Sequence, residues 1–474
     1  MSSQTNRSKS RPLEIYTRTD GVYKFVQAHS HHLRRLQIDC DSLDTLSNLT
    51  GSYPHLEELV ISYYLDYEDG GEEQDLAVPL LFLDQIPHLC RLILRGIYSW
   101  FDSFKNLTQL LLDPKLKWPV DSLPRILDVL RSSPTLEVLI LKDPEEPERG
   151  TFVDITNKIE LPHLKRLSLS DFDVSNSPAI TKFISIPRGC CMSYVALFAS
   201  IPLASATNFK ALFPGDNASV GPLQNIKSLE LRFDPSYSAE YPLDTVNVSG
   251  PSGAFHCDLP YLYRTTGFDE AMSHLIQFPL EELWMSDNAR YSPSVAQSSR
   301  PAFRKAFAGL SSLEKLVLEM EADDLLLDAI GALYPSLHLD PLPIIPSPRL
   351  HRLWITGQAE LLYQVRESLL SCIKNRHTRG HVIHELRFQL YTLKPDDLNS
   401  LLPNAAKELV DTFRGVVEVV HVGRLPTDGI PLPPSTQSIF HYPIENDDIW
   451  WPEWRPWKRP SKKRPQKAMY YING

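Results

Sequence analysis

The stretch Tyr53-Pro-His-Leu56-Glu-Glu-Leu59-Val-Ile61 contains the pattern that decides the fold. In it, an apolar residue, two variable residues, a second apolar residue, one variable residue and a third apolar residue follow in order. The second and third apolar residues are two positions apart, so they point to the same face of a β-strand. The first apolar residue lies in the turn before the strand. Pro54 stands two residues ahead of it, where proline fixes φ before the hydrogen bonds of the strand begin.

This pattern recurs along most of the chain, at steps that vary between 18 and 62 residues. Weaker copies lie near Leu13 and Val417, and the two longest steps each predict one hidden strand, at 191–197 and 254–259. Leucine-rich repeats have periods of roughly 20–29 residues, so these repeats are irregular and somewhat longer. The eleven good copies begin at Leu33, Leu56, Leu89, Leu107, Leu136, Leu164, Ile226, Leu280, Leu313, Leu350 and Ile383.

Segments with helical spacing separate some of the strands, at 122–130, 303–310 and 325–333. A strand, a helix and a parallel strand form a right-handed crossover unit, and stacked units complete one another's core. The sequence therefore predicts an α/β fold, an irregular leucine-rich-repeat solenoid with a curved parallel β-sheet and helices on its outer face. We expect an N-terminal segment with a truncated repeat at 1–29, the solenoid at 30–425, and a Pro/Trp-rich, basic tail at 426–474.

Composition narrows the class of protein. The chain of 474 residues is 42% apolar and carries a net charge of −10, which argues against a general nucleic-acid binder. No apolar run approaches the ~18 residues of a membrane helix, and no secretory signal is visible. Six scattered cysteines do not form a disulfide framework. These features predict a cytoplasmic and/or nuclear protein without a membrane or nucleic-acid partner.

The residue between the second and third apolar positions faces away from the core, on the surface that repeat proteins present to partners. Two of these residues are Trp, a type that dominates binding hot spots together with Arg. These outward residues have two interpretations: they dock a partner protein, or another part of the chain covers them. Both stay open for the first half of the chain, and docking is favoured for the two Trp. The candidate partner-binding residues are Trp284, Trp354, Arg352, Glu282, Arg387, Ile93, Leu111 and Ile140.

Catalytic motifs are scarce. There is no phosphate loop and no dinucleotide fingerprint, and Gly250-Pro-Ser252-Gly253 is one residue short of a nucleophile elbow. A cluster of His377, His381 and His384 with Cys372 matches zinc ligand spacing only loosely. We therefore expect no enzyme, no metal and no cofactor. A metal-dependent enzyme that uses His377 and His381 is the remote alternative.

Five passages carry a resemblance to a known family: Arg7–Ile15, His32–Ile38, Tyr53–Leu59, Phe278–Trp284 and Leu369–Leu386. They resemble fungal F-box/leucine-rich-repeat proteins, and the likeness covers most of residues 7–425. Such proteins dock an N-terminal F-box on a Skp-type adaptor and hold a protein for ubiquitination on their repeats. The resemblance implies a non-catalytic interaction platform, a substrate-recognition subunit of a Skp-cullin-F-box ubiquitin ligase or its F-box-less relative. No Leu-Pro-x-Glu-type F-box helix precedes Leu13 here, so we expect adaptor binding only if an F-box is restored. A leucine-rich-repeat scaffold without a ligase link is the alternative.

Overall fold

A computed structural model gives the fold of the chain. The predicted tail at 426–474 lies outside the described residues, as do residues 1–11. Within the part of the chain that is described, no helix has the length and apolar character needed to span a membrane. The structure describes residues 12–17, 23–40, 46, 51–63, 86–96, 104–113, 122–142, 158–172, 180–196, 221–234, 243–260, 276, 278–287, 300–320, 323–334, 345–391 and 398–424.

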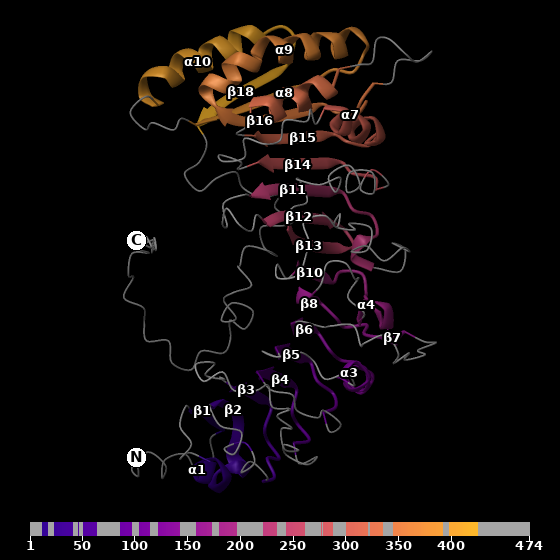
Figure 1. Cartoon of the computed structure of the whole chain (residues 1–474), viewed down its shortest axis with the longest axis vertical. Helices are drawn as coiled ribbons and strands as arrows, with labels where there is room; N and C mark the ends of the chain where they lie inside the picture. The colour runs from indigo at the N-terminus through magenta and orange to yellow at the C-terminus, as the bar shows by residue number, and fades with distance from the viewer. Residues whose placement is uncertain are drawn as a thin grey trace, which may run out of the picture.

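One mixed, mostly parallel sheet of 16 strands runs through the molecule, and Figure 1 shows its strands stacked along the longest axis. A second sheet pairs β7 (Ile159–Glu160) with β9 (Ile184–Ser185). In spatial order the large sheet contains β1 (Leu13–Thr17), β2 (Leu33–Cys40), β3 (Glu58–Tyr63), β4 (Arg91–Arg95), β5 (Gln109–Asp113), β6 (Val138–Lys142), β8 (Arg166–Phe172), β10 (Cys191–Ala196), β13 (Gly253–Pro260), β12 (Leu243–Gly250), β11 (Ser228–Asp234), β14 (Glu282–Asp287), β15 (Lys315–Met320), β16 (Arg352–Gln358), β17 (Glu385–Tyr391) and β18 (Val419–Arg424).

The repeated pattern sets the register of this sheet. Its second apolar residue pairs with the same residue of the next copy, as Leu59 does with Leu92 and Leu316 with Leu353. These leucines are at most 1% exposed and belong to one continuous core cluster. The strands thus share one apolar face, which is buried in the core. Parallel sheets bury such a face beneath the helices that connect their strands.

The turn before the strands repeats as well. The Leu56 amide donates to the Tyr53 carbonyl at 3.2 Å, and the Leu136 amide donates to the Ser133 carbonyl at 3.1 Å. These are β-turns with Pro54 and Pro134 at the second position, where the fixed φ of proline fits. Where the pattern contains this proline, it closes a turn just ahead of the strand.

The helices pack on the inward face of the sheet, and their buried residues join the core of the strands. In Figure 1, α3, α4 and α7 lie on the same side of the stack. The helices predicted at 122–130, 303–310 and 325–333 are present, whereas α9 and α10 were not predicted. The helices are α1 (Tyr23–Ala28), α3 (Ser122–Arg131), α4 (Ile180–Phe183), α7 (Arg300–Gly309), α8 (Asp323–Ala332), α9 (Ala359–Thr378) and α10 (Leu398–Phe413).

The prediction of a wholly parallel sheet is wrong at β12. The two hidden strands predicted at 191–197 and 254–259 are present as β10 and β13. However, β12 runs antiparallel to both of its neighbours and places β13, not β11, beside β10. The elbow-like Gly250-Pro-Ser252-Gly253 is the hairpin turn between β12 and β13. At Gly253, where φ is 129°, an added Cβ would lie 2.4 Å from the Cys190 carbonyl oxygen.

A buried arginine joins α9 to the turn before β16. The Arg376 guanidinium donates to the carbonyl oxygens of Pro346 at 2.7 Å and Ser347 at 2.9 Å, and the residue is 1% exposed. Ser347 has a positive φ of 44°, a conformation that costs free energy unless its surroundings hold it. The strained turn precedes β16, and α9 follows it. Arg376 therefore holds this turn in place from α9.

Replacing Arg376 should destabilise this end of the sheet. We expect Arg376→Ala to lower the free energy of unfolding by about 3 kcal/mol, since it removes the Arg376 donor from the Pro346 carbonyl, leaves the Ser347 carbonyl with the Leu350 amide alone, and opens a cavity. Lys374→Ala, on the exposed side of the same helix, should change it by less than about 0.5 kcal/mol. Urea titration followed by circular dichroism measures both, and equal effects would contradict this role.

Cys372 offers a second test of the packing of α9. Burial raises the pKa of its thiol to about 12, so at pH 8 almost none of it is the reactive thiolate. We expect iodoacetamide to modify Cys372 much more slowly than the half-buried Cys90, and to modify both alike in urea. Peptide mass spectrometry measures the two rates. Fast native labelling of Cys372 would show that α9 is not packed as described.

Candidate functional site

A single row of side chains crosses the outward face of the sheet, opposite the helices. Each copy of the pattern contributes the residue between its second and third apolar positions, and the strand register aligns these residues from β1 to β18. In spatial order the outward row is Tyr16, Gln37, Val60, Ile93, Leu111, Ile140, Ser168, Ser193, His256, Asn247, Glu230, Trp284, Val317, Trp354, Arg387 and His421.

The first part of the row is apolar and buried. Val60, Ile93, Leu111 and Ile140 form a separate cluster and are 3–5% exposed. Five strands separate this cluster from β14, so it does not join the two Trp. Such burial is expected if another part of the chain covers the cluster. Contact of Ile93, Leu111 and Ile140 with a partner stays a prediction.

The middle of the row is polar. His256 Nδ1 donates to Asn247 Oδ1 at 2.6 Å, and Asn247 Nδ2 donates to Glu230 Oε2 at 2.9 Å. Arg232 lies 3.5 Å from the other oxygen of Glu230, which is 3% exposed. This chain of bonds satisfies a buried carboxylate that would otherwise be costly to desolvate.

The predicted residues on β14 to β17 come together. The rings of Trp284 and Trp354 meet edge to face with centroids 6.1 Å apart. The Lys315 ammonium lies 4.5 Å from the Trp284 centroid and 3.8 Å from the Trp354 centroid. On the other side, the Arg387 guanidinium lies 4.1 Å from the Trp354 centroid. Trp354 is thus held between cations from the two neighbouring strands, which are favourable cation–π contacts.

Carboxylates that lie two residues earlier on these strands, on the same outward face, hold this cluster in place. Glu282 accepts from Trp284 Nε1 at 2.7 Å and from Lys315 Nζ at 2.5 Å. Glu385 lies 3.4 Å from Arg387, whereas Arg352 finds Glu314 only at 4.0 Å. The candidate residues Glu282, Trp284, Arg352, Trp354 and Arg387 therefore form one aromatic and charged surface.

Lys315 is the member that the sequence analysis missed. It occupies the same outward position as Glu282 and Arg352, with which it pairs in register, so the repeat itself contained the signal. Burial lowers the pKa of Lys315, and the nearby Arg352 and Arg387 lower it further, while Glu282 opposes both effects. Glu282 is therefore the group that keeps a charged lysine on this surface.

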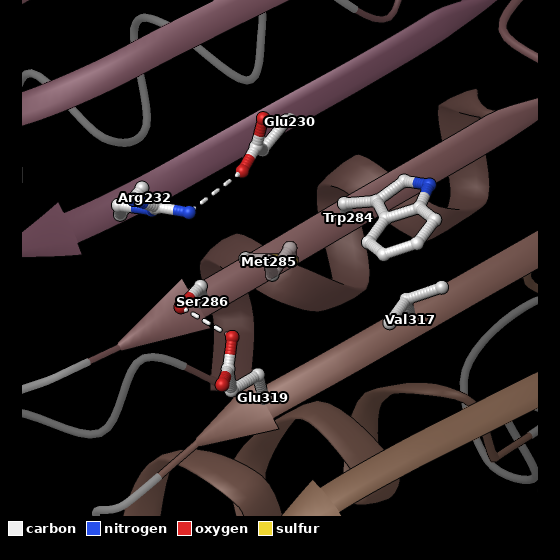
Figure 2. A pocket seen from close by; sticks show the side chains of 7 residues that line it. All are labelled: Glu230, Arg232, Trp284, Met285, Ser286, Val317 and Glu319. Atoms are coloured by element: carbon white, nitrogen blue, oxygen red, sulfur yellow. Dashed lines mark hydrogen bonds and ion pairs between the residues drawn. The ribbon is translucent and has the colours of Figure 1, made fainter. Parts of the chain in front are cut away.

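A shallow hollow borders the cluster between β11 and β15. Figure 2 shows Trp284 and Val317 at one end of it and the charged side chains at the other. There Arg232 faces Glu230, and Ser286 Oγ donates to Glu319 Oε2 at 2.9 Å. These polar groups are already engaged with one another, so the hollow extends the Trp surface without adding a reactive group.

The histidine cluster is dispersed by the fold. His377 lies in the last turn of α9, His381 Nδ1 donates to the Pro348 carbonyl at 2.9 Å, and His384 lies 2.9 Å from Glu418. Cys372 is buried inside α9. Among the described residues, no group of three or more His, Cys, Asp or Glu is arranged to hold a metal ion.

No protein-family model matches the chain, and no curated protein is significantly similar to it.

Glu282 provides the test of the cluster. We expect Glu282→Gln to lower the free energy of unfolding by about 1–3 kcal/mol, because it leaves the nearly buried Lys315 ammonium without its carboxylate. Adding Lys315→Met should recover part of the loss, and a double-mutant cycle in urea measures the coupling.

Glu281→Gln is the matched control, since Glu281 pairs with Lys227 where both side chains are 40–45% exposed. It should cost less than about 0.5 kcal/mol. Equal losses for the Glu281 and Glu282 variants would contradict a special role for Glu282.

Proposed function

We propose that this chain is a non-catalytic protein–protein interaction platform built as an irregular leucine-rich-repeat solenoid. We further propose that it belongs with the substrate-recognition subunits of Skp-cullin-F-box ubiquitin ligases, as a member or as an F-box-less relative. The partner in this proposal is a protein bound on the outward face of the sheet. No catalytic group, metal or cofactor takes part.

The observation that carries this proposal is the cluster on β14 to β17. Trp354, Arg352 and Arg387 are of the residue types that supply most of the binding energy at protein interfaces, and the buried Trp284 supports Trp354 from below. Their positions are fixed by strand register and by Glu282, so little conformational entropy is lost when a partner binds. Sites on strands are held more firmly than sites on loops.

The solenoid assignment is supported by the repeated turn, the in-register leucines and the helices on the inward face. The antiparallel β12 departs from a simple stack of units, and it does so without interrupting the outward row. All six cysteines are free, which supports the reducing cytoplasm or nucleus as the compartment.

Trp354 provides the direct test. The full chain, immobilised, is used to identify proteins from cells of its source, and the enriched partner is then purified and titrated. We expect Trp354→Ala to weaken its binding by about 30-fold or more, as the loss of a hot-spot residue does. Tyr363→Ala is the control, because Tyr363 is 49% exposed on α9, away from the outward face. Equal binding by wild type and the Trp354 variant would overturn the proposal.

A second experiment separates the ligase assignment from a scaffold. Purified Skp-type adaptor is mixed with the full chain and analysed by size-exclusion chromatography. A complex supports the assignment as a ligase subunit with its own adaptor site, and its absence favours an F-box-less relative or a scaffold without a ligase link. Neither outcome changes the assignment of the partner surface.

A further inference from the structure

The part of the cluster that a partner can reach is cationic. Trp284, Lys315 and Val317 are 6%, 9% and 1% exposed, so they support the surface from below. The side chains of Arg352 and Arg387 are 42% and 34% exposed, and Trp354, which shares β16 with Arg352 and pairs in register with Arg387, is half-buried. We call Arg352, Trp354 and Arg387 the β16–β17 surface.

The charges beneath and around this surface do not balance. Lys315, Arg352 and Arg387 supply three cations on neighbouring strands. Glu282 is engaged with Lys315 and Trp284, and Glu385 serves Arg387. Glu385 is the register partner of Arg352, but its ion pair is with Arg387. The carboxylate that pairs with Arg352 is Glu314, which binds Arg349 at 3.0 Å and reaches Arg352 only at 4.0 Å. Arg352 is therefore the cation with the weakest compensation.

Unused donors point to the same conclusion. Within the described structure, Arg352 Nε and Trp354 Nε1 are buried atoms without an acceptor. Trp284, by contrast, donates its indole N–H to Glu282. A buried donor without an acceptor costs about 1–3 kcal/mol, so both atoms add to the excess of hydrogen-bond donors over acceptors on β16.

The chemistry of the surface selects the partner. A basic segment would add to an existing surplus of positive charge, and an apolar segment would desolvate two guanidinium groups without pairing them. A carboxylate accepts two parallel hydrogen bonds from a guanidinium, the strongest geometry available to these side chains. The net charge of −10 of the whole chain repels an acidic partner at long range, so recognition depends on these short contacts.

We infer that the β16–β17 surface binds an acidic segment of a partner protein, with its Asp or Glu carboxylates on Arg352 and Arg387 and its backbone across Trp354. This inference rests on the proposed function and names the class of partner segment. It distinguishes the cationic β16–β17 surface from the buried apolar cluster at Val60 to Ile140.

The test uses the purified full chain and two short fluorescein-labelled peptides. One alternates Glu and Ser, and the other has Gln in place of every Glu. Fluorescence anisotropy should give binding of the Glu peptide at least about tenfold tighter than that of the Gln peptide. The double variant Arg352→Gln/Arg387→Gln should remove this difference, and Arg352→Lys/Arg387→Lys should keep only part of it, because lysine lacks the bidentate fork.

The matched control is Arg131→Gln, on α3, whose side chain is 45% exposed and pairs with Asp128. It should leave peptide binding unchanged. Equal binding of the two peptides, or an unchanged Glu-peptide affinity in the double Gln variant, would overturn the inference.

The binding of the purified partner separates this inference from the proposed function. If Trp354→Ala releases the partner while the double Gln variant keeps it, the docking surface stands and the acidic class is wrong. Circular dichroism confirms that each variant is folded, which the exposure of both arginines leads us to expect.

Discussion

The in-register alignment of buried leucines is the constraint on which the rest of the structure depends. Leu59, Leu92, Leu110 and Leu139 occupy the same level of four successive strands and are at most 1% exposed. Because the side chains of a strand alternate, a one-residue slip would place every leucine of that strand on the outward face. Burial of the leucines therefore fixes the position of every outward residue, whether or not that residue makes contacts of its own.

This constraint turns a loose repeat into an ordered surface. Residues as distant in sequence as Trp284 and Arg387 come within reach of Trp354 because each stands at the same point of its own copy. The outward row changes from apolar at β3–β6, through polar at β13–β11, to aromatic and cationic at β14–β17. One face thus has regions of different chemistry, and only the last combines exposed charge with Trp.

The strands, several helices and most of the candidate surface were predictable from the sequence, because apolar spacing records both burial and register. Trp284 and Trp354 were found by their position in the pattern, and Lys315 could have been found in the same way. The antiparallel β12 could not, since Val246 and Val248 alternate simply and their partners are set by a hairpin. Three-dimensional packing, which no local pattern encodes, sets the burial of Val60, Ile93, Leu111 and Ile140 and leaves Trp354 Nε1 without an acceptor.

Strand register aligns the outward row from the first strand to the last, and disulfide formation between paired cysteines tests this alignment most directly. Register partners on adjacent strands lie about 4.8 Å apart, within disulfide reach, whereas positions displaced by two residues lie about 7–8 Å apart. Under mild oxidation we expect cross-links in Tyr16→Cys/Gln37→Cys and in Arg387→Cys/His421→Cys. The displaced pairs Glu14→Cys/Gln37→Cys and Glu385→Cys/His421→Cys should remain reduced, and cross-links in these pairs instead would contradict the shared register.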